Sequence, residues 1–312
     1  MSDEKKNLVV VTGPTASGKT RLAALLAHKL RGEVISADSM QVYRGMDIGT
    51  GKDLVDYEVE GHQVPVHLLD ICEAGEKYDV FRYQKDFNLV FADLLARRSL
   101  PVMCGGTGLY VQAASQQYDL PQVPQNPALR EDLQQRSMEQ LQGIFLNLEP
   151  RPHNTTDLKD RDRLVRAIEI ARYKKEHPEK QQELLQPRPL YFLVHFPREL
   201  QKQRICQRLH QRLETGMVEE TQGLLDRGVP ATVLEYYGLE YRYISLFLRG
   251  ELSYNEMFEK LNIAIRQFAK RQMTWFRRME KQGAVLHWVP GEWPLKEKLD
   301  FCMKVIEVEV EI

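Results

Sequence analysis

A short apolar segment followed by a glycine-rich motif constrains the fold of this 312-residue chain more than any other feature. Leu8–Thr12 (LVVVT) has the β-branched composition of a buried parallel strand. The G-x-x-x-x-G-K-T pattern of Gly13–Thr20 follows, and Thr20–Leu30 has helical apolar spacing. Because backbone N–H groups at such a turn point toward an anion at the helix N-terminus, the pattern predicts a phosphate-binding P-loop. An ordinary glycine-rich turn is the alternative, and the agreement of strand and helix disfavours it.

Within the motif, individual residue types predict individual contacts. Lys19 is expected to reach the outer phosphates, and the Thr20 hydroxyl is placed to hold a Mg²⁺ ion. The predicted phosphate-binding residues are Gly13, Thr15, Ala16, Ser17, Gly18, Lys19 and Thr20.

Composition excludes several other classes of protein. The hydrophobic fraction of 43% is enough for a sizeable core and argues against disorder. No segment approaches the ~20 apolar residues of a membrane span, and the N-terminus has no secretion signal. The four cysteines are scattered without C-x-x-C spacing, which predicts free thiols in a reducing compartment. We therefore expect a cytoplasmic protein without membrane contact. We also expect a monomer, although none of these features determines the oligomeric state.

Strand and helix patterns alternate along the chain. Short strands are predicted over Glu33–Ala37, His67–Ile71, Leu100–Cys104 and Leu190–Phe196, and a helix over Phe81–Arg98. After Pro197 nearly everything looks helical to about Gln282. Pro/Gln-rich linkers at Leu120–Pro127 and His177–Pro189 flank helical material. We predict an α/β fold, a P-loop NTPase-like parallel sheet flanked by helices (residues 1–120 and 188–312), with a smaller, mostly helical insert (residues 121–187).

Polar residues follow two of these strands at the edge where open parallel sheets bind ligands. Asp38 ends the strand after the P-loop helix, and Thr107 lies in the glycine-rich turn after Leu100–Cys104. Asp38 could act as a general base, cap a helix or face Mg²⁺. An ATPase would need a carboxylate after a hydrophobic strand, and the strand ending at Cys104 continues into glycines instead. Asp70 could be the carboxylate that an ATPase needs, or it could be a structural carboxylate.

Cations gather near the C-terminus although the net charge is −1. Seven Lys or Arg residues and one acid occur over Lys260–Lys281, and Arg266, Lys270 and Arg277 share one helical face. Such a stripe is commonly a solvated helix face, but it also fits contacts with a nucleic-acid backbone.

Four sequence blocks resemble one known family. GPTASGKT, DSMQVYRGMDIGTGK, GGTGLY and RQFAKRQMTWFR occur in this order between residues 13 and 278 and are similar to those of the tRNA dimethylallyltransferases, or tRNA isopentenyltransferases. The second block is specific, since generic P-loop kinases do not carry it. Arg161–Arg172 and Glu251–Met257 also resemble the family, whereas Tyr236–Tyr241 and His153–Lys159 depart from its pattern. No Cys/His zinc module follows Trp293, which is typical of bacterial members.

The resemblance implies a reaction. A dimethylallyl group would pass from dimethylallyl diphosphate to the N6 amine of adenosine 37, 3′-adjacent to the anticodon, in tRNAs that read codons beginning with U. The P-loop residues and Mg²⁺ would then stabilise the leaving diphosphate. Asp38 would accept the amine proton, and Thr107 would orient the reacting groups. Arg204 or Arg208 could supply another cation, and the family pattern favours Arg208 as the third catalytic residue.

Contacts with the tRNA anticodon stem-loop are implied as well, because the base must leave its stack to react. Gln41 would read the adenine edge, or it is a surface polar residue. The implied tRNA-binding residues are Asp38, Ser39, Met40, Gln41, Thr107, Arg130, Arg266, Lys270 and Arg271. Two other functions stay open at this point: a P-loop small-molecule kinase that uses ATP, with Asp38 as the base for a hydroxyl, and a tRNA-binding protein without chemistry.

Overall fold

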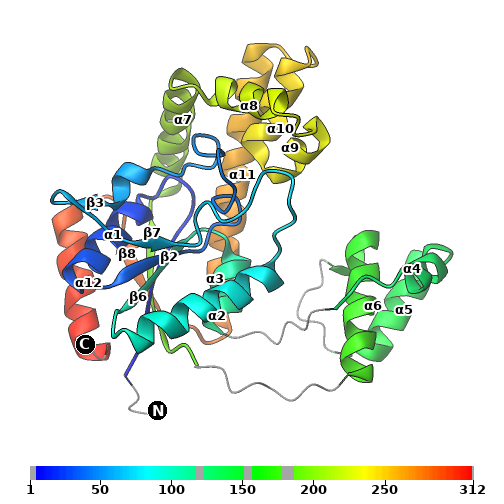
Figure 1. Cartoon of the computed structure of the whole chain (residues 1–312), viewed down its shortest axis with the longest axis horizontal. Coiled ribbons are helices and arrows are strands. Elements are labelled where there is room, and N and C mark those ends of the chain that lie inside the picture. The colour runs from blue at the N-terminus through cyan, green and yellow to red at the C-terminus, as the bar shows by residue number, and fades with distance from the viewer. Residues whose placement is uncertain (1–4, 117–122, 151–156, 178–185, 311–312) are drawn as a thin grey trace. The chain divides into compact units, whose positions relative to one another are not determined.

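The computed structural model describes residues 5–116, 123–150, 157–177 and 186–310, and the chain divides into two compact units (Figure 1). Residues 1–118 and 185–312 form the larger unit, and residues 119–184 form the smaller one. No helix in the described ranges is long and apolar enough to cross a membrane. All four cysteines are free thiols, as their spacing predicts.

A parallel sheet forms the centre of the larger unit. In the described part of the chain it has six strands in the order β5-β2-β6-β1-β7-β8, and every neighbouring pair is parallel. Buried apolar runs such as that of β1 are expected for strands covered on both faces. The strands are β1 (Leu8–Thr12), β2 (Glu33–Ser36), β5 (Val66–His67), β6 (Pro101–Gly105), β7 (Pro189–His195) and β8 (Leu286–Pro290).

Helices cover both faces of this sheet (Figure 1). On one face, α1 (Lys19–Lys29) and α12 (Leu295–Glu309) bury Leu22, Leu26 and Ile306 against the strands. On the other face lie α2 (Val80–Ala96) and α3 (Gly108–Ser115), which belong to a second apolar core. The fold predicted from the alternation of strands and helices is thereby confirmed.

A helical cluster follows β7 and packs onto the P-loop. It contains α7 (Arg198–Glu214), α8 (Met217–Asp226), α9 (Ala231–Tyr237), α10 (Leu239–Leu248) and α11 (Tyr254–Lys281). Its core includes Ala16 of the P-loop together with Ile205 and Ile265, so the cluster adjoins the phosphate motif directly. The prediction of helices from Pro197 to about Gln282 is confirmed.

The long helix α11 links two of these cores. Ser253 begins it with a capping box, in which the Ser253 hydroxyl accepts a bond from the Glu256 N–H and the Glu256 carboxylate accepts one from the Ser253 N–H at 2.9 Å. Its first half packs Leu261 into the helical cluster, and its second half packs Phe276 under the sheet. One rigid helix therefore runs beside both the P-loop and the turn after β6.

Two parts of the sequence prediction need correction. A strand over His67–Ile71 is wrong, because the strand ends at His67, and Leu68 and Asp70 have left-handed φ angles of 61° and 51°. The sequence interpretation also missed β8 and α12, as well as the short hairpin of β3 (Glu58–Val59) and β4 (His62–Gln63) with its 3₁₀ helix η1 (Leu54–Tyr57).

The smaller unit has its own core. Its helices pack Leu133, Leu141, Leu164 and Ile168 together. The elements are α4 (Pro127–Gln134), α5 (Met138–Leu148), the 3₁₀ helix η2 (Asp157–Lys159) and α6 (Arg161–Glu176).

Candidate active site

A cavity of about 510 Å³ lies at the carboxyl edge of the sheet, above the P-loop. Its walls come from the P-loop, the segment after β2, the turn after β6, helix α7 and the junction of α9 with α10. Of the predicted site residues, it is lined by Thr15, Ala16, Ser17, Gly18, Lys19, Thr20, Asp38, Ser39, Met40, Gln41, Thr107 and Arg208. These residues are thus brought into one site from four separate segments.

The P-loop has the backbone that its glycines predict. Gly18 is the N-cap of α1 with a left-handed φ of 77°, which glycine adopts without strain. A Cβ on Gly13 would lie 2.4 Å from the Val194 carbonyl oxygen, so only glycine fits between the motif and β7. Burial lowers the pKa of Lys19, while the charge of nearby Asp38 acts in the opposite direction. The lysine therefore lies within electrostatic reach of the proposed base.

Asp38 and Thr107 belong to one hydrogen-bonded turn. The Asp38 Oδ1 accepts a bond from the Met40 N–H at 3.1 Å, an Asx-type turn rather than a helix N-cap. The Ser39 N–H donates to the Thr107 Oγ1 at 3.0 Å, and the Thr107 N–H donates to the Ala37 carbonyl at 3.3 Å. The ends of β2 and β6 are held together in this way, with one Asp38 carboxylate oxygen outside these bonds.

A buried glutamine on α11 ties the two glycine-rich turns together. The Gln272 Oε1 accepts a bond from the Thr15 N–H at 2.9 Å, and its Nε2 donates to the Gly106 carbonyl at 2.8 Å. A Cβ on Gly106 would lie 2.5 Å from that Nε2. Sequence reasoning missed Gln272, although it lies inside the RQFAKRQMTWFR block.

Helix α7 supplies further contacts to the P-loop. The Arg204 Nε donates to the Ala16 carbonyl at 3.0 Å, and the Arg208 Nη2 donates to the Thr15 hydroxyl. Burial and the neighbouring Arg212 lower the pKa of Arg208 to about 9. Both arginines line the cavity, where Arg204 bonds to the P-loop backbone and Arg208 bonds to a P-loop side chain.

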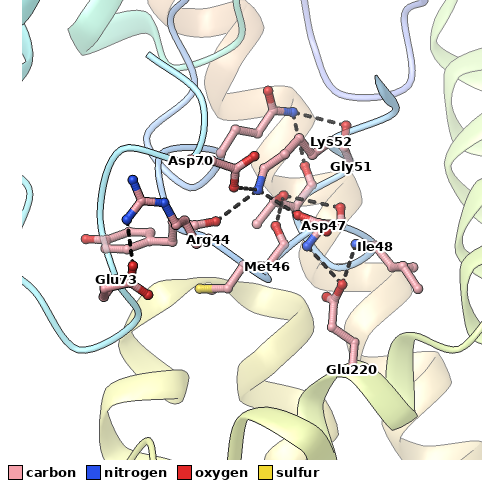
Figure 2. Close-up of polar contacts among 12 residues, drawn as sticks. Arg44, Met46, Asp47, Ile48, Gly51, Lys52, Asp70, Glu73 and Glu220 are labelled. Carbon is pink, nitrogen blue, oxygen red and sulfur yellow. Dashed lines mark hydrogen bonds and ion pairs between the residues drawn. The ribbon is translucent and has the colours of Figure 1, made fainter. Parts of the chain in front are cut away.

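The side chain of Lys52, the last residue of the Asp47–Lys52 loop, is at the centre of the polar contacts that hold this loop (Figure 2). The Lys52 Nζ donates to Asp47 Oδ1 at 2.7 Å, to Asp70 Oδ1 at 2.5 Å and to the Tyr43 carbonyl at 2.9 Å. The Lys52 side chain is fully buried. The sequence allowed Asp70 to be either a Mg²⁺ ligand or a structural carboxylate. In the structure it is an ion-pair partner of Lys52.

Helix α8 holds the same loop from the other side (Figure 2). The carboxylate of Glu220 accepts bonds from the backbone N–H groups of Asp47, Ile48 and Gly49 at 2.9, 2.7 and 3.0 Å. It also accepts one from the Tyr241 hydroxyl at 2.7 Å. The loop that walls the cavity therefore has a fixed backbone.

Gln41 also bonds to this loop. Its Nε2 donates to the Gly51 carbonyl at 3.0 Å and to the Thr50 carbonyl at 3.5 Å. The amide nitrogen therefore has partners within the protein, and the side chain is more than a surface polar group.

Four predicted tRNA-binding residues lie outside the cavity. In the smaller unit, Arg130 donates to both carboxylate oxygens of Glu169, at 2.8 and 2.7 Å. On α11, Arg266 and Lys270 line a separate groove of about 650 Å³ together with Arg277, so the shared helical face is confirmed. Arg271 is exposed, with its guanidinium 5.8 Å from the Phe268 ring centroid.

The residues near Thr20 suit a Mg²⁺ ion that takes most of its ligands from phosphate oxygens and water. Thr20 lines the cavity together with Asp53 and Asp56, and burial followed by the charge of Asp53 raises the pKa of Asp56. In the described residues no group of three His, Cys, Asp or Glu side chains could hold a metal alone. Mg²⁺ in phosphate sites usually takes one or two carboxylates, water and substrate oxygens, and this donor set suits that arrangement.

Comparison with known proteins identifies the family. A family model described as IPP transferase matches residues 41–279, and one described as isopentenyl transferase matches residues 6–65. The tRNA dimethylallyltransferase 2 of Porphyromonas gingivalis (strain ATCC BAA-308 / W83) is 49% identical over 96% of this chain and 98% of its own length. This chain belongs to the tRNA dimethylallyltransferase family. Another such relative, from Syntrophotalea carbinolica, is 54% identical over 91% of this chain and 94% of its own length.

Solved structures of tRNA prenyltransferases share the fold. The tRNA isopentenylpyrophosphate transferase of Bacillus halodurans superposes with a TM-score of 0.72 at 30% identity, over 98% of this chain and 97% of the other. A eukaryotic dimethylallyltransferase acting on tRNA gives a TM-score of 0.78 at 21% identity, over 97% of this chain and 78% of the other. Membership of the family favours prenyl transfer over the small-molecule kinase that the P-loop alone left open.

Proposed function

We propose that this chain transfers a dimethylallyl group from dimethylallyl diphosphate to the N6 amine of adenosine 37 in tRNAs that read codons beginning with U. One observation carries the proposal beyond the family assignment: the P-loop and the Asp38–Thr107 turn line the same cavity. A leaving diphosphate and an attacking amine can thus be held in one cavity. The chain's relatives named tRNA dimethylallyltransferase support the choice of both substrates.

The residues divide the chemistry between the two reacting ends. The allylic C–O bond breaks, and the P-loop N–H groups with Lys19 and Arg208 stabilise the charge that develops on the diphosphate. The N6–carbon bond forms, and Asp38 accepts the N6 proton. Thr107, which already bonds to Ser39, orients the reacting pair beside Asp38. The Thr20 hydroxyl would hold a Mg²⁺ ion, which would supply further positive charge to the leaving group.

The tRNA approaches by the side of the cavity formed by the segment after β2 and the α9–α10 junction. Ser39, Met40 and Gln41 line this side, and Tyr236 is 83% exposed there, where a base could stack on it. Arg266, Lys270 and Arg271 bind phosphates of the anticodon stem, and Arg130 contributes from the smaller unit. The enzyme acts as a cytoplasmic monomer.

A labelling assay tests this function. The purified chain, with Mg²⁺, labelled dimethylallyl diphosphate and unmodified tRNA, transfers label to the tRNA, and Lys19→Met abolishes the transfer. Lys296→Met, an exposed surface change, serves as the matched control. Failure to label any tRNA would reject the function, and undiminished labelling by Asp38→Ala would reject the assigned base. A parallel reaction with γ-labelled ATP tests the kinase directly.

A further inference from the structure

Arg212 is a buried cation in the cavity that no step above uses. It lies one helical turn after Arg208 on α7, and both side chains line the cavity. Arg212 is only 8% exposed, and its Nη2 has no hydrogen-bond partner among the residues that the structure describes. The Asp53 carboxylate is 3.7 Å from that nitrogen, but it is itself half exposed. A guanidinium buried this deeply needs an acceptor for its free N–H.

The Asp47–Lys52 loop is shaped to admit this guanidinium. A Cβ built on Gly51 would lie 1.8 Å from the Arg212 Nη2 and 2.7 Å from its Cζ. Any side chain at position 51 would therefore displace the arginine. Gln41 donates a hydrogen bond to the Gly51 carbonyl, and the Lys52 amine makes three hydrogen bonds within the protein. Because these bonds fix the loop, the loop in turn holds the Arg212 guanidinium in place.

Cations and acids gather around Arg212. Arg208 and Lys19 both lie within electrostatic range of it, which makes three positive side chains at this wall. Asp38, Asp53 and Glu240 face the same cations, and burial raises the pKa of Glu240. Two arginines one turn apart repel each other, and an anion bound by both removes that cost.

We propose that Arg212 is a second guanidinium for the diphosphate of the prenyl donor, donating to a phosphate oxygen beside the one that Arg208 binds. The assignment rests on the proposed function, because it takes dimethylallyl diphosphate as the donor. The planar fork of arginine suits this contact, since it presents paired donors to phosphate. Arg212 thereby increases the affinity for the donor and stabilises the departing group.

Calorimetry with inorganic diphosphate and Mg²⁺ tests the contact without any transfer reaction. We expect Arg212→Met to weaken diphosphate binding by about 10- to 100-fold, the loss typical of one charge-assisted hydrogen bond. The diphosphate affinity of Arg212→Lys should lie between those of the wild type and Arg212→Met, because lysine keeps the positive charge but lacks the paired donors of arginine. Arg242→Met, on the exposed side of α10, is the matched control and should bind diphosphate normally. An unchanged affinity in a folded Arg212→Met protein would overturn the proposal.

Two further variants separate binding from a merely structural role. Because Asp53 also belongs to the carboxylates that suit Mg²⁺, its variant is titrated with diphosphate in a chelating buffer without Mg²⁺. If Arg212 only holds the loop through Asp53, then Asp53→Asn will weaken this metal-free binding as Arg212→Met does, and the proposal is wrong. The proposal predicts that Asp53→Asn binds metal-free diphosphate at least as tightly as the wild type. Gly51→Ala displaces the guanidinium and should also weaken diphosphate binding, with no additional loss when combined with Arg212→Met.

The transfer assay keeps this proposal distinct from the function. In it, Arg212→Met should raise the KM for dimethylallyl diphosphate by a similar factor, and the KM for tRNA should stay unchanged. Labelling of tRNA with an unchanged donor KM would reject the role of Arg212 and leave the function standing. Absence of labelling by the wild type would reject the function, while the calorimetry would still decide whether Arg212 binds diphosphate.

Discussion

Replacing Glu220 with glutamine tests whether one carboxylate fixes the wall of the cavity. The Glu220 Oε2 accepts the N–H groups of Asp47 and Ile48, and its Oε1 accepts the Gly49 N–H and the Tyr241 hydroxyl. Glutamine has the same shape but only one carbonyl oxygen. Its NH₂ group must then face at least one backbone N–H that has lost its acceptor.

The magnitude follows from these bonds. Leaving one partly buried donor unsatisfied costs about 1–3 kcal/mol, and the bonds that remain lose the assistance of a charge. We therefore expect the loop to open more easily by about 2–3 kcal/mol. A local opening free energy that falls by this amount accelerates amide exchange by about 30- to 150-fold.

Native-state hydrogen exchange measures the effect directly. Peptides that contain Asp47–Gly49 should exchange faster by that factor in Glu220→Gln, while peptides of β1 should keep their protection. Glu219→Gln, the exposed neighbour on the same helix, provides the matched control. Exchange of Asp47–Gly49 at the wild-type rate in Glu220→Gln would refute the reasoning.

Three other predictions follow from buried contacts. Lys52→Met leaves two carboxylates without their cation, so the free energy of unfolding should fall by about 3 kcal/mol relative to that of the exposed variant Lys296→Met. Gln272→Ala should raise the Kd for inorganic diphosphate by about 10-fold and lower the free energy of unfolding by about 1–3 kcal/mol, since the Thr15 N–H and the Gly106 carbonyl both lose their partner. Burial alone would raise the pKa of Glu169, but hydrogen bonds led by Arg130 hold that pKa at about 2. Its stabilisation is present above pH 4.5 and is lost as the pH falls toward 2, so the stability difference between wild type and Glu169→Gln should shrink over that interval.

The residues of the site that the sequence predicted belong to local motifs. The P-loop is recognisable because strand, glycine turn and helix are contiguous, and its backbone conformation follows from the glycines themselves. The meeting of Asp38 with Thr107 follows from a general rule, since the carboxyl ends of parallel strands share one edge of the sheet. Both kinds of prediction need only short segments and one rule of topology.

The residues that the sequence did not predict act through long-range contacts. Gln272 bonds to Thr15 across 257 positions, and Glu220 bonds to Asp47 across 173. No local pattern encodes such a pairing, because helical periodicity shows which face of α11 is buried but not what lies against it. The role of Asp70 could not be predicted for the same reason, since only the fold reveals Lys52 as its partner.

The missed elements have weak local signals. Helix α12 begins after Pro294 without a side-chain cap, and β8 (LHWVP) mixes polar and apolar residues over a short run. The strand predicted over His67–Ile71 failed for the opposite reason. Its apolar residues suit a strand, but tertiary contacts of Asp70 stabilise a left-handed backbone there.

The single-turnover rate of dimethylallyl transfer by Asp38→Asn tests the central claim most directly. Asparagine keeps the shape of Asp38 but cannot accept the N6 proton. The account predicts that formation of N6-dimethylallyladenosine, followed by mass spectrometry of the digested tRNA, slows by about 10²- to 10⁴-fold. Binding of inorganic diphosphate should not weaken, because the P-loop is intact. Transfer by Asp38→Asn at the wild-type rate would contradict the account.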